Sequence, residues 1–239
     1  EILQRGGSWK ELLPFGNPMD VLSSCLRAFI QPEKGKRFLS ADFANIEGRG
    51  VAWISYEEDE LQKFRDFDTF VLDASGNRIP VDKQGNECEL GKHEGFKRVG
   101  ADLYKLTAAG ILNKPHTQIT SDERQAYGKV PSLSLGYMGG AGAFKAMAKT
   151  YGVEMSDEKI QSIVKGWRNI HPNIVQYAYD NYKTIMDVIR TGKGEWSGRV
   201  YHYLEDLFLC TKLPSGRIIR YAYPRIEMVT TPWGDERLG

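Results

Sequence analysis

Residues 38–55, FLSADFANIEGRGVAWIS, constrain the fold of this chain more than any other stretch. The residues Phe38–Ala41 predict a short apolar strand, and Asp42 stands at its end. Glu47 follows five residues later and opens an apolar helical run to Ile54. A carboxylate at a strand-to-helix turn suits a hard cation such as Mg²⁺, which takes oxygen ligands. On this stretch alone the better interpretation is that Asp42 is only a helix N-cap, a role that Asp often fills.

Composition is that of an ordinary globular protein. The chain has 239 residues, of which 41% are hydrophobic and 26% are charged. This length allows one large domain or two smaller ones with a substantial core. No apolar run approaches the roughly 20 residues that cross a membrane, and no signal peptide is visible at the start. Cys25, Cys88 and Cys210 have neither metal-ligand nor disulfide spacing, so we expect a reducing, intracellular setting.

Charge is distributed unevenly, although the net charge is only +1. Residues 190–225 contain seven basic side chains and three acids, whereas residues 57–60 are all acidic. A basic tract can form a surface that faces phosphates. A solvated face is the commoner explanation, so the basic tract alone does not indicate a nucleic-acid partner.

Helical periodicity alternates with turn signals in the first half of the chain. Helices are predicted over Met19–Ile30, with an apolar face that includes Phe29, and from the acidic residues to about Phe67. Residues 68–100 instead predict strand, turn and strand around Ala74–Asn77. We expect a surface hairpin there and assign it no chemistry.

Two further helices follow, and the second carries a candidate site. The first is predicted over Asp102–Leu112. The second begins with the capping-box pattern Thr120-Ser121-Asp122-Glu123. Within it Lys129, Leu133 and Tyr137 are spaced by four residues, so they share one helix face.

Arg124 breaks this spacing because it lies five residues before Lys129, while Gln125 occupies the position four before. At roughly 100° per residue, five residues place Arg124 about 140° from Lys129, whereas four would leave about 40°. A π-bulge could absorb the extra residue, and such bulges favour functional sites. Pro131 lacks an amide hydrogen and is expected to kink the helix near Tyr127. Taken alone, the stretch is better interpreted as an amphipathic helix with surface cations.

The last third of the chain predicts two helices and a hairpin. Ser156 caps the first helix, and the second runs from His171-Pro172 to Gly192. We expect His171 to be a turn residue. The segments Leu207–Leu213 and Arg217–Tyr223 flank a proline-glycine turn, which is a hairpin pattern. The apolar face expected for the first of these helices comprises Ile160, Ile163, Val164 and Trp167.

Two of these stretches resemble family-A DNA polymerases, the polymerase-I-type and phage replicative enzymes. The segment SADFANIEGR resembles their motif A, Asp-Tyr-Ser-Gln-Ile-Glu-Leu-Arg, and matches it at Asp42, Ile46, Glu47 and Arg49. Gly48 stands in place of the motif's Leu. Residues 124–137 resemble motif B, the nucleotide-binding helix of the fingers, and the glycine-rich sequel resembles phage members in particular. Leu133 stands where many relatives have Phe or Tyr.

The resemblance implies an α+β fold in three parts. Residues 1–55 would form part of a palm with antiparallel strands. Residues 56–199 would form mostly helical fingers with a β-hairpin insertion at about 68–100, and residues 200–239 would return to the palm. The implied reaction is template-directed addition of a dNTP to a primer 3′ end by two-metal phosphoryl transfer with Mg²⁺. The implied setting is viral or bacterial replication machinery in the cytoplasm.

The resemblance also implies roles for single residues. Asp42 would be catalytic and, with the backbone carbonyl of Phe43, would hold metal. Glu47 and Tyr137 would close around the incoming sugar. The implied nucleotide-binding residues are Glu47, Arg124, Lys129, Leu133 and Tyr137, of which Lys129 and Arg124 would neutralise the triphosphate. Arg217 and Arg220 would contact primer-template DNA.

The second catalytic carboxylate of the family, in a His-Asp-Glu motif, is missing, since none of the four histidines precedes an Asp. We therefore expect a polymerase fragment that needs the remainder of the enzyme, including a thumb, and is inactive alone. The alternative is a non-catalytic nucleic-acid- or nucleotide-binding module. A metal-dependent hydrolase built on Asp42 and Glu47 is disfavoured, because no other ligand cluster accompanies them.

Overall fold

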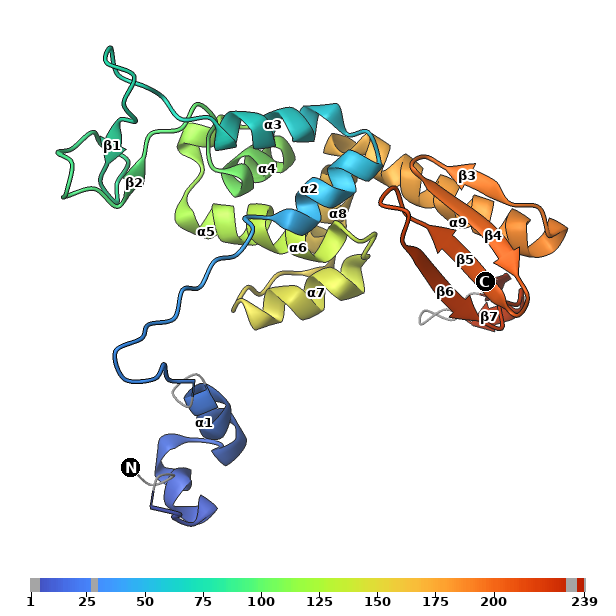
Figure 1. The fold of residues 1–239 in the computed structure, drawn as a ribbon, viewed down its shortest axis with the longest axis horizontal. Coiled ribbons are helices and arrows are strands. Elements are labelled where there is room, and N and C mark those ends of the chain that lie inside the picture. The colour runs from blue at the N-terminus through green and yellow to red at the C-terminus, as the bar shows by residue number, and fades with distance from the viewer. Residues whose placement is uncertain (1–4, 27–29, 231–235, 239) are drawn as a thin grey trace. The chain divides into compact units, whose positions relative to one another are not determined.

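The computed structural model describes residues 5–26, 30–230 and 236–238. The fold is mixed α+β, as predicted, with helices and antiparallel strands (Figure 1). The chain forms two compact units, Glu1–Ala44 and Asn45–Gly239, which we call the N-terminal unit and the C-terminal unit. Among the described residues, no helix is both long and apolar enough to span a membrane.

The N-terminal unit begins with two short helices. Ser8 caps the 3₁₀ helix η1 (Trp9–Phe15), and α1 (Pro18–Cys25) follows. The helix predicted over 19–30 is thus confirmed as far as Cys25, whereas Phe29 lies outside the described residues. The apolar face expected for this helix is not buried in a core, because none of the residues of α1 is buried. All residues of α1 are among those that the structure describes.

The strand predicted over Phe38–Ala41 is wrong. Within the described residues, 37–43 form no strand, and the side chain of Leu39 is 90% exposed. A strand forms only where a neighbour satisfies its amide and carbonyl groups. The described part of the N-terminal unit contains helices and loops, so residues 37–43 remain extended and exposed.

The helical part of the C-terminal unit runs from α2 to α9. Its elements are α2 (Ile46–Ile54), α3 (Glu58–Asp68), α4 (Leu103–Leu112), the 3₁₀ turn η3 (His116–Gln118), α5 (Ser121–Glu123), the π-helix η4 (Arg124–Lys129), α6 (Val130–Leu135), α7 (Ala141–Thr150), α8 (Asp157–Ile170) and α9 (Pro172–Thr191). Thr120 and Glu123 form the predicted capping box. The predicted helix boundaries at Ser156 and Gly192 are also confirmed.

Helices α6, α7 and α8 share a hydrophobic core. Its buried side chains are Val130, Leu135, Phe144, Ala148, Ile160, Ile163, Val164, Trp167 and Ile174. All four apolar residues predicted for one face of α8 belong to it, as expected for apolar residues at the helical period. A smaller cluster of Ala52, Phe64 and Leu103 joins α2, α3 and α4.

Between α3 and α4, within the predicted 68–100, the chain forms the expected strands and turns with short antiparallel pairings. β1 (Pro80–Val81) pairs with β2 (Gly95–Phe96). Two turns share the sequence Asp-x-x-Gly-Asn, at Asp73–Asn77 and Asp82–Asn86. In each turn the Asp side chain accepts hydrogen bonds of 2.9 Å from the amides two and four residues ahead. These local bonds explain why the turns form without help from the core.

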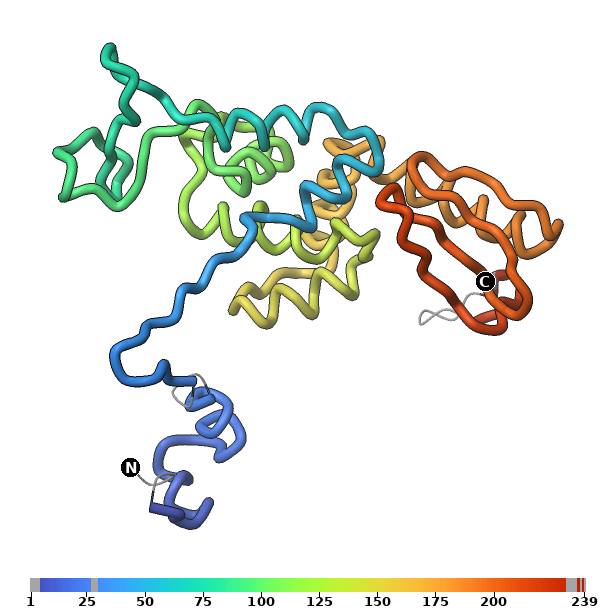
Figure 2. The backbone as a smooth tube through the Cα atoms, in the orientation of Figure 1, coloured from blue at the N-terminus to red at the C-terminus, as the bar shows by residue number. Residues whose placement is uncertain are grey.

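A four-stranded antiparallel sheet follows α9 in the order β3-β4-β5-β6, labelled in Figure 1, and Figure 2 traces the same orange-to-red part of the chain as a tube. Its strands are β3 (Glu195–Ser197), β4 (Val200–Glu205), β5 (Phe208–Lys212) and β6 (Ile218–Ala222). The hairpin predicted over 207–223 is confirmed as β5 and β6. A final short hairpin pairs β7 (Met228–Thr230) with β8 (Glu236–Leu238).

Candidate nucleotide-binding site

The helix that carries the candidate site contains a π turn, which accommodates the five-residue spacing of Arg124 and Lys129. Residues Arg124–Lys129 form π-helix η4, and the Val130 amide bonds the carbonyl of Gln125, five residues back. Because a π turn is closed by i→i+5 bonds, Arg124 and Lys129 lie one turn apart. Pro131 explains the position of the π turn, since it offers no hydrogen to the carbonyl of Tyr127. Pro131 was expected to kink the helix near Tyr127, and the structure shows a switch there from i→i+4 to i→i+5 hydrogen bonds.

Gly128 lets the π-helix approach α4 closely. A Cβ added at Gly128 would lie 2.1 Å from the backbone oxygen of Tyr104. Any side chain at this position would push η4 away from α4, so the position needs glycine. The glycine therefore sets the distance between the candidate nucleotide-binding helix and the start of α4.

Arg124 is held by the residue that caps α4. Its Nε and Nη2 each donate to the carboxylate of Asp102 at 2.9 Å, and its guanidinium lies 5.0 Å from the ring centre of Tyr104. Burial raises the pKa of Asp102, but hydrogen bonds from Arg124 and the Lys105 amide outweigh it, so this pKa lies below its ordinary value. Arg124 thus connects η4 to α4. Its guanidinium has five N–H donors, so some remain available for another partner.

Lys129 lies on the same helix and has no ion pair with a described carboxylate. Its ammonium instead lies 4.6 Å from the ring centre of Tyr151. Leu133 is half-buried, and Tyr137 is 70% exposed. α6 ends at Leu135, two residues before the predicted end, because Met138 adopts a left-handed conformation with φ of 60°.

Glu47, in the first turn of α2, lies near two tyrosines of this site. Burial and then the Glu47 carboxylate raise the pKa of Tyr137. Burial is also the largest cause of the raised pKa of Tyr104; Arg124 opposes it and Glu47 adds to it. The charge of Glu47, on α2, thus acts on the pKa of Tyr137, which lies just beyond the end of α6.

Two other motif residues connect α2 to α3. Arg49 donates a bidentate pair to Asp68, with Nη2–Oδ1 at 2.9 Å, and its guanidinium lies 4.6 Å from the ring centre of Phe64. A Cβ added at Gly48 would lie 3.3 Å from the Phe64 ring and 2.9 Å from the Asn45 side chain. The close packing of α2 against α3 thus explains why glycine stands where the motif has Leu.

Asp42 and Phe43 belong to the N-terminal unit and lie in its exposed extended segment. The interpretation of Asp42 as a helix N-cap is wrong, because α2 begins after Asn45, which occupies the N-cap position with φ of 55°. A carboxylate and a backbone carbonyl are the donors that Mg²⁺ prefers. Within the described ranges, however, no group of three or more His, Cys, Asp or Glu side chains could hold a metal ion. The described residues do not by themselves form a metal site.

Arg217 and Arg220 lie on the last hairpin of the four-stranded sheet. Arg217 is exposed in the turn that joins β5 to β6, where its carbonyl accepts from the Leu213 amide at 2.8 Å. Arg220 Nη2 donates to Glu205 Oε2 at 3.1 Å, and this pairing raises the pKa of Arg220. The strand register places Arg220 opposite Cys210, which pairs with Tyr203, so these three side chains share one face.

Sequence reasoning missed a buried polar group that joins α3 to α8 and α9. Glu57 of the acidic cluster is buried and accepts from the amides of Asn173 at 2.9 Å and Ile174 at 3.2 Å. Glu60 lies 3.5 Å from Nε2 of His171. His171 is not a simple turn residue: it is buried, and its Nδ1 lies 2.9 Å from the Trp167 carbonyl. The sequence signal that could have indicated this buried group is the three-residue spacing of Glu57 and Glu60, which places both on one side of the start of α3.

Comparison with known proteins places the chain among relatives of a DNA polymerase. No protein-family model matches it. The chain is similar to the DNA polymerase of Bacillus phage SP02, with 30% identity over 244 residues. The match covers 99% of this chain and 31% of that polymerase, so the chain spans about a third of its relative's length. The predicted relationship to phage DNA polymerases is confirmed at this level.

Proposed function

We propose that this chain carries the fingers and part of the palm of a polymerase-I-type, family-A DNA polymerase. Its boundaries would be those the sequence predicts: 1–55 palm, 56–199 fingers with the insertion, and 200–239 returning to the palm. The reaction would be template-directed addition of a dNTP to a primer 3′ end. The proposal rests chiefly on the 30% identity that extends over 99% of the chain.

The nucleotide would bind along η4 and α6. Lys129 is suited to the triphosphate because its ammonium is unpaired with any described acid, and a fixed cation stabilises charge on phosphate oxygens. Arg124 would contribute its remaining donors while Asp102 holds it in place. Burial and then Glu47 raise the pKa of the Tyr137 phenol, and Glu47 and Tyr137 would both contact the sugar. Leu133 would lie beside the nucleotide on the same helix.

Asp42 and the carbonyl of Phe43 would contribute ligands to Mg²⁺ in the complete enzyme. Their oxygen donors fit that ion, but the described residues supply too few of them. Bound in a pair, such ions stabilise the attacking and leaving oxygens of phosphoryl transfer. The remaining carboxylate would come from the rest of the polymerase. Arg217 and Arg220 would contact the backbone of primer-template DNA.

Primer extension by the complete polymerase that contains this chain tests the proposal. Asp42→Ala should abolish extension and leave primer-template binding unchanged, while the control Asp20→Asn, also in the N-terminal unit, should extend normally. Lys129→Ala should raise the KM for dNTP more than it weakens DNA binding. Extension by the Asp42→Ala enzyme would exclude the metal role and favour a non-catalytic binding module. Extension by the 239-residue chain alone would show that no further part is needed.

A further inference from the structure

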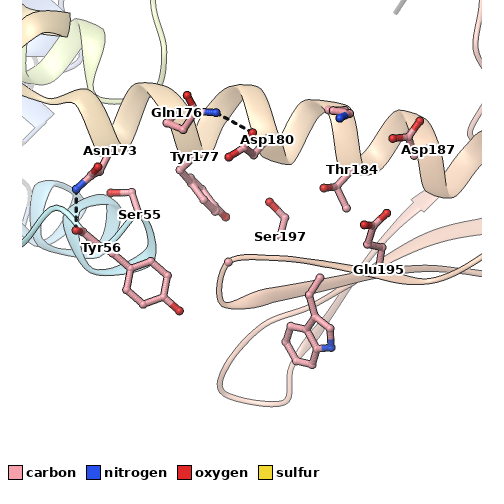
Figure 3. A pocket seen from close by; sticks show the side chains of 13 residues that line it. Ser55, Tyr56, Asn173, Gln176, Tyr177, Asp180, Thr184, Asp187, Glu195 and Ser197 are labelled. Atoms are coloured by element: carbon pink, nitrogen blue, oxygen red, sulfur yellow. Dashed lines mark hydrogen bonds between the residues drawn. The ribbon is translucent and has the colours of Figure 1, made fainter.

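A cavity in the C-terminal unit lies apart from every residue assigned above. It has a volume of about 580 Å³ and lies between α9, the β3 strand and the turn after α2 (Figure 3). None of the residues proposed to bind metal, nucleotide or DNA lines it. Its character therefore has to be inferred from its own side chains.

The lining is acidic. Asp180 and Asp187 face the cavity from α9, and Glu195 faces it from β3. Lys183 is the cation among the lining residues, and Arg190, outside the lining, pairs with Asp187, which leaves an excess of one negative charge. Asp180 accepts from Gln176 at 2.8 Å and Asp187 from Arg190 at 2.9 Å, and no described residue pairs with Glu195. Such a lining attracts cations and repels phosphates.

Ser197 gives a second, independent sign of a ligand. Its side chain is 3% exposed, and its Oγ is buried without a hydrogen-bond partner among the described residues. Figure 3 shows the Ser197 hydroxyl directed into the cavity, on the same side as the Tyr177 phenol and the Glu195 carboxylate. A buried hydroxyl without a partner is costly, because it has lost water and gained nothing in return. Neighbouring side chains cover the hydroxyl, so a ligand N–H in the cavity would satisfy it once those side chains move aside.

The spacing of the acids indicates the kind of cation. Asp180 and Asp187 are seven residues apart on one helix, so they lie two turns or about 10 Å apart along α9. A single metal ion cannot contact both, and within the described ranges no group of three or more His, Cys, Asp or Glu side chains could hold one. Burial raises the pKa of the Tyr177 phenol, which keeps it neutral. The site is suited to several N–H donors spread along a chain.

We propose that this cavity binds an extended alkylammonium, a molecule with two or more ammonium groups joined by methylene chains. The ammonium groups are paired with Asp180, Asp187 and Glu195, and one N–H is donated to Ser197 Oγ. The methylene chain lies along the ring of Tyr177. Free polyamines and lysine side chains of a basic peptide share this chemistry, and the experiment separates them. The proposal is independent of the polymerase assignment.

Calorimetric titration of the 239-residue chain with spermidine tests this site. We expect saturable binding with one molecule per chain. Glu195→Gln should weaken it about tenfold, the effect of removing one charged hydrogen-bond partner. Ser197→Ala should weaken it several-fold without lowering the melting temperature, because the hydroxyl has no described partner to lose. The control Glu89→Gln removes an exposed carboxylate of the insertion and should bind like the wild type.

Three outcomes would overturn the proposal. They are the absence of saturable spermidine binding, an equal loss in the Glu89→Gln control, and wild-type affinity in both the Glu195→Gln and Ser197→Ala variants. A parallel titration with an oligolysine peptide identifies the source of the ammonium groups. Tighter binding of the peptide, in competition with spermidine and weakened by Glu195→Gln, would support the site and assign it to a basic protein segment.

Discussion

Asp42 and Lys129 were both predicted to serve the same reaction, yet their surroundings differ. Asp42 lies in an exposed extended segment of the N-terminal unit, where the described residues form no strand. Lys129 ends a π-helix that is fixed to α4 by Gly128 and by the bidentate Arg124–Asp102 pair. The position of Lys129 is therefore fixed by packing between η4 and α4. The position of Asp42 is not fixed in this way, so the two regions should respond differently to substitution.

The largest effect is expected where η4 meets α4. Gly128→Ala would place a Cβ 2.1 Å from the Tyr104 oxygen, so η4 must move. We expect a loss of about 3 kcal/mol in the free energy of unfolding, as for overpacked cores. Urea unfolding of the 239-residue chain measures it. Gly142→Ala is the matched control, because that helical glycine has open space around it and should gain about 0.5–1 kcal/mol. Equal stability of the two variants would contradict the close approach.

A contribution of similar size, present at neutral pH and lost in acid, is expected from Glu60. Burial raises its pKa, but His171 and Lys63 more than offset this and lower it from 4.5 to about 2. A lowered pKa in the folded state means that the ionised carboxylate stabilises the fold above pH 4.5, and that this stability is lost as the pH falls toward 2. The shift corresponds to about 3 kcal/mol. Glu60→Gln should remove this part of the acid sensitivity, whereas exposed Glu58→Gln should keep it; the same pH profile for both would refute the buried pair.

The Arg124–Asp102 pair should contribute less, because both side chains are about a third exposed. Arg124→Gln should cost about 1 kcal/mol in urea unfolding. Arg124→Lys should recover part of the loss, since it keeps the charge but not the bidentate geometry. Arg65→Gln, which removes a more exposed pair with Glu58, should have no measurable effect. An equal loss in Arg124→Lys and Arg124→Gln would show that geometry, and not charge, supplies the whole contribution.

Local signals predicted much of the fold. The capping box at Thr120, the apolar face of α8 and the hairpin of β5 and β6 all depend on residues near one another in sequence. The sequence also offered a π turn as one way to absorb the extra residue before Lys129, and the missing amide of Pro131 fits the turn that is observed.

Long-range pairing was not predictable in this way. Glu57 bonds Asn173 from 116 residues away, and Arg124 bonds Asp102 from 22 residues away. No periodic pattern links such positions, since periodicity reports only which face of an element is apolar. The prediction of a strand before Asp42 was wrong for the same reason. A strand needs a neighbouring strand to pair with, and the sequence of the segment itself does not show whether one is present.

The smallest effect on stability is expected at Asp42 itself. Its segment is exposed and extended, and substitutions at such positions rarely change the free energy of unfolding. Asp42→Asn should therefore leave the urea midpoint of the 239-residue chain unchanged, as should the nearby control Leu39→Ser, whose side chain is 90% exposed. A lower midpoint in Asp42→Asn alone would reveal a structural partner. An unchanged midpoint, together with loss of primer extension in the complete polymerase, would separate the chemistry of Asp42 from the fold, a separation that packed Gly128 and Arg124 do not allow.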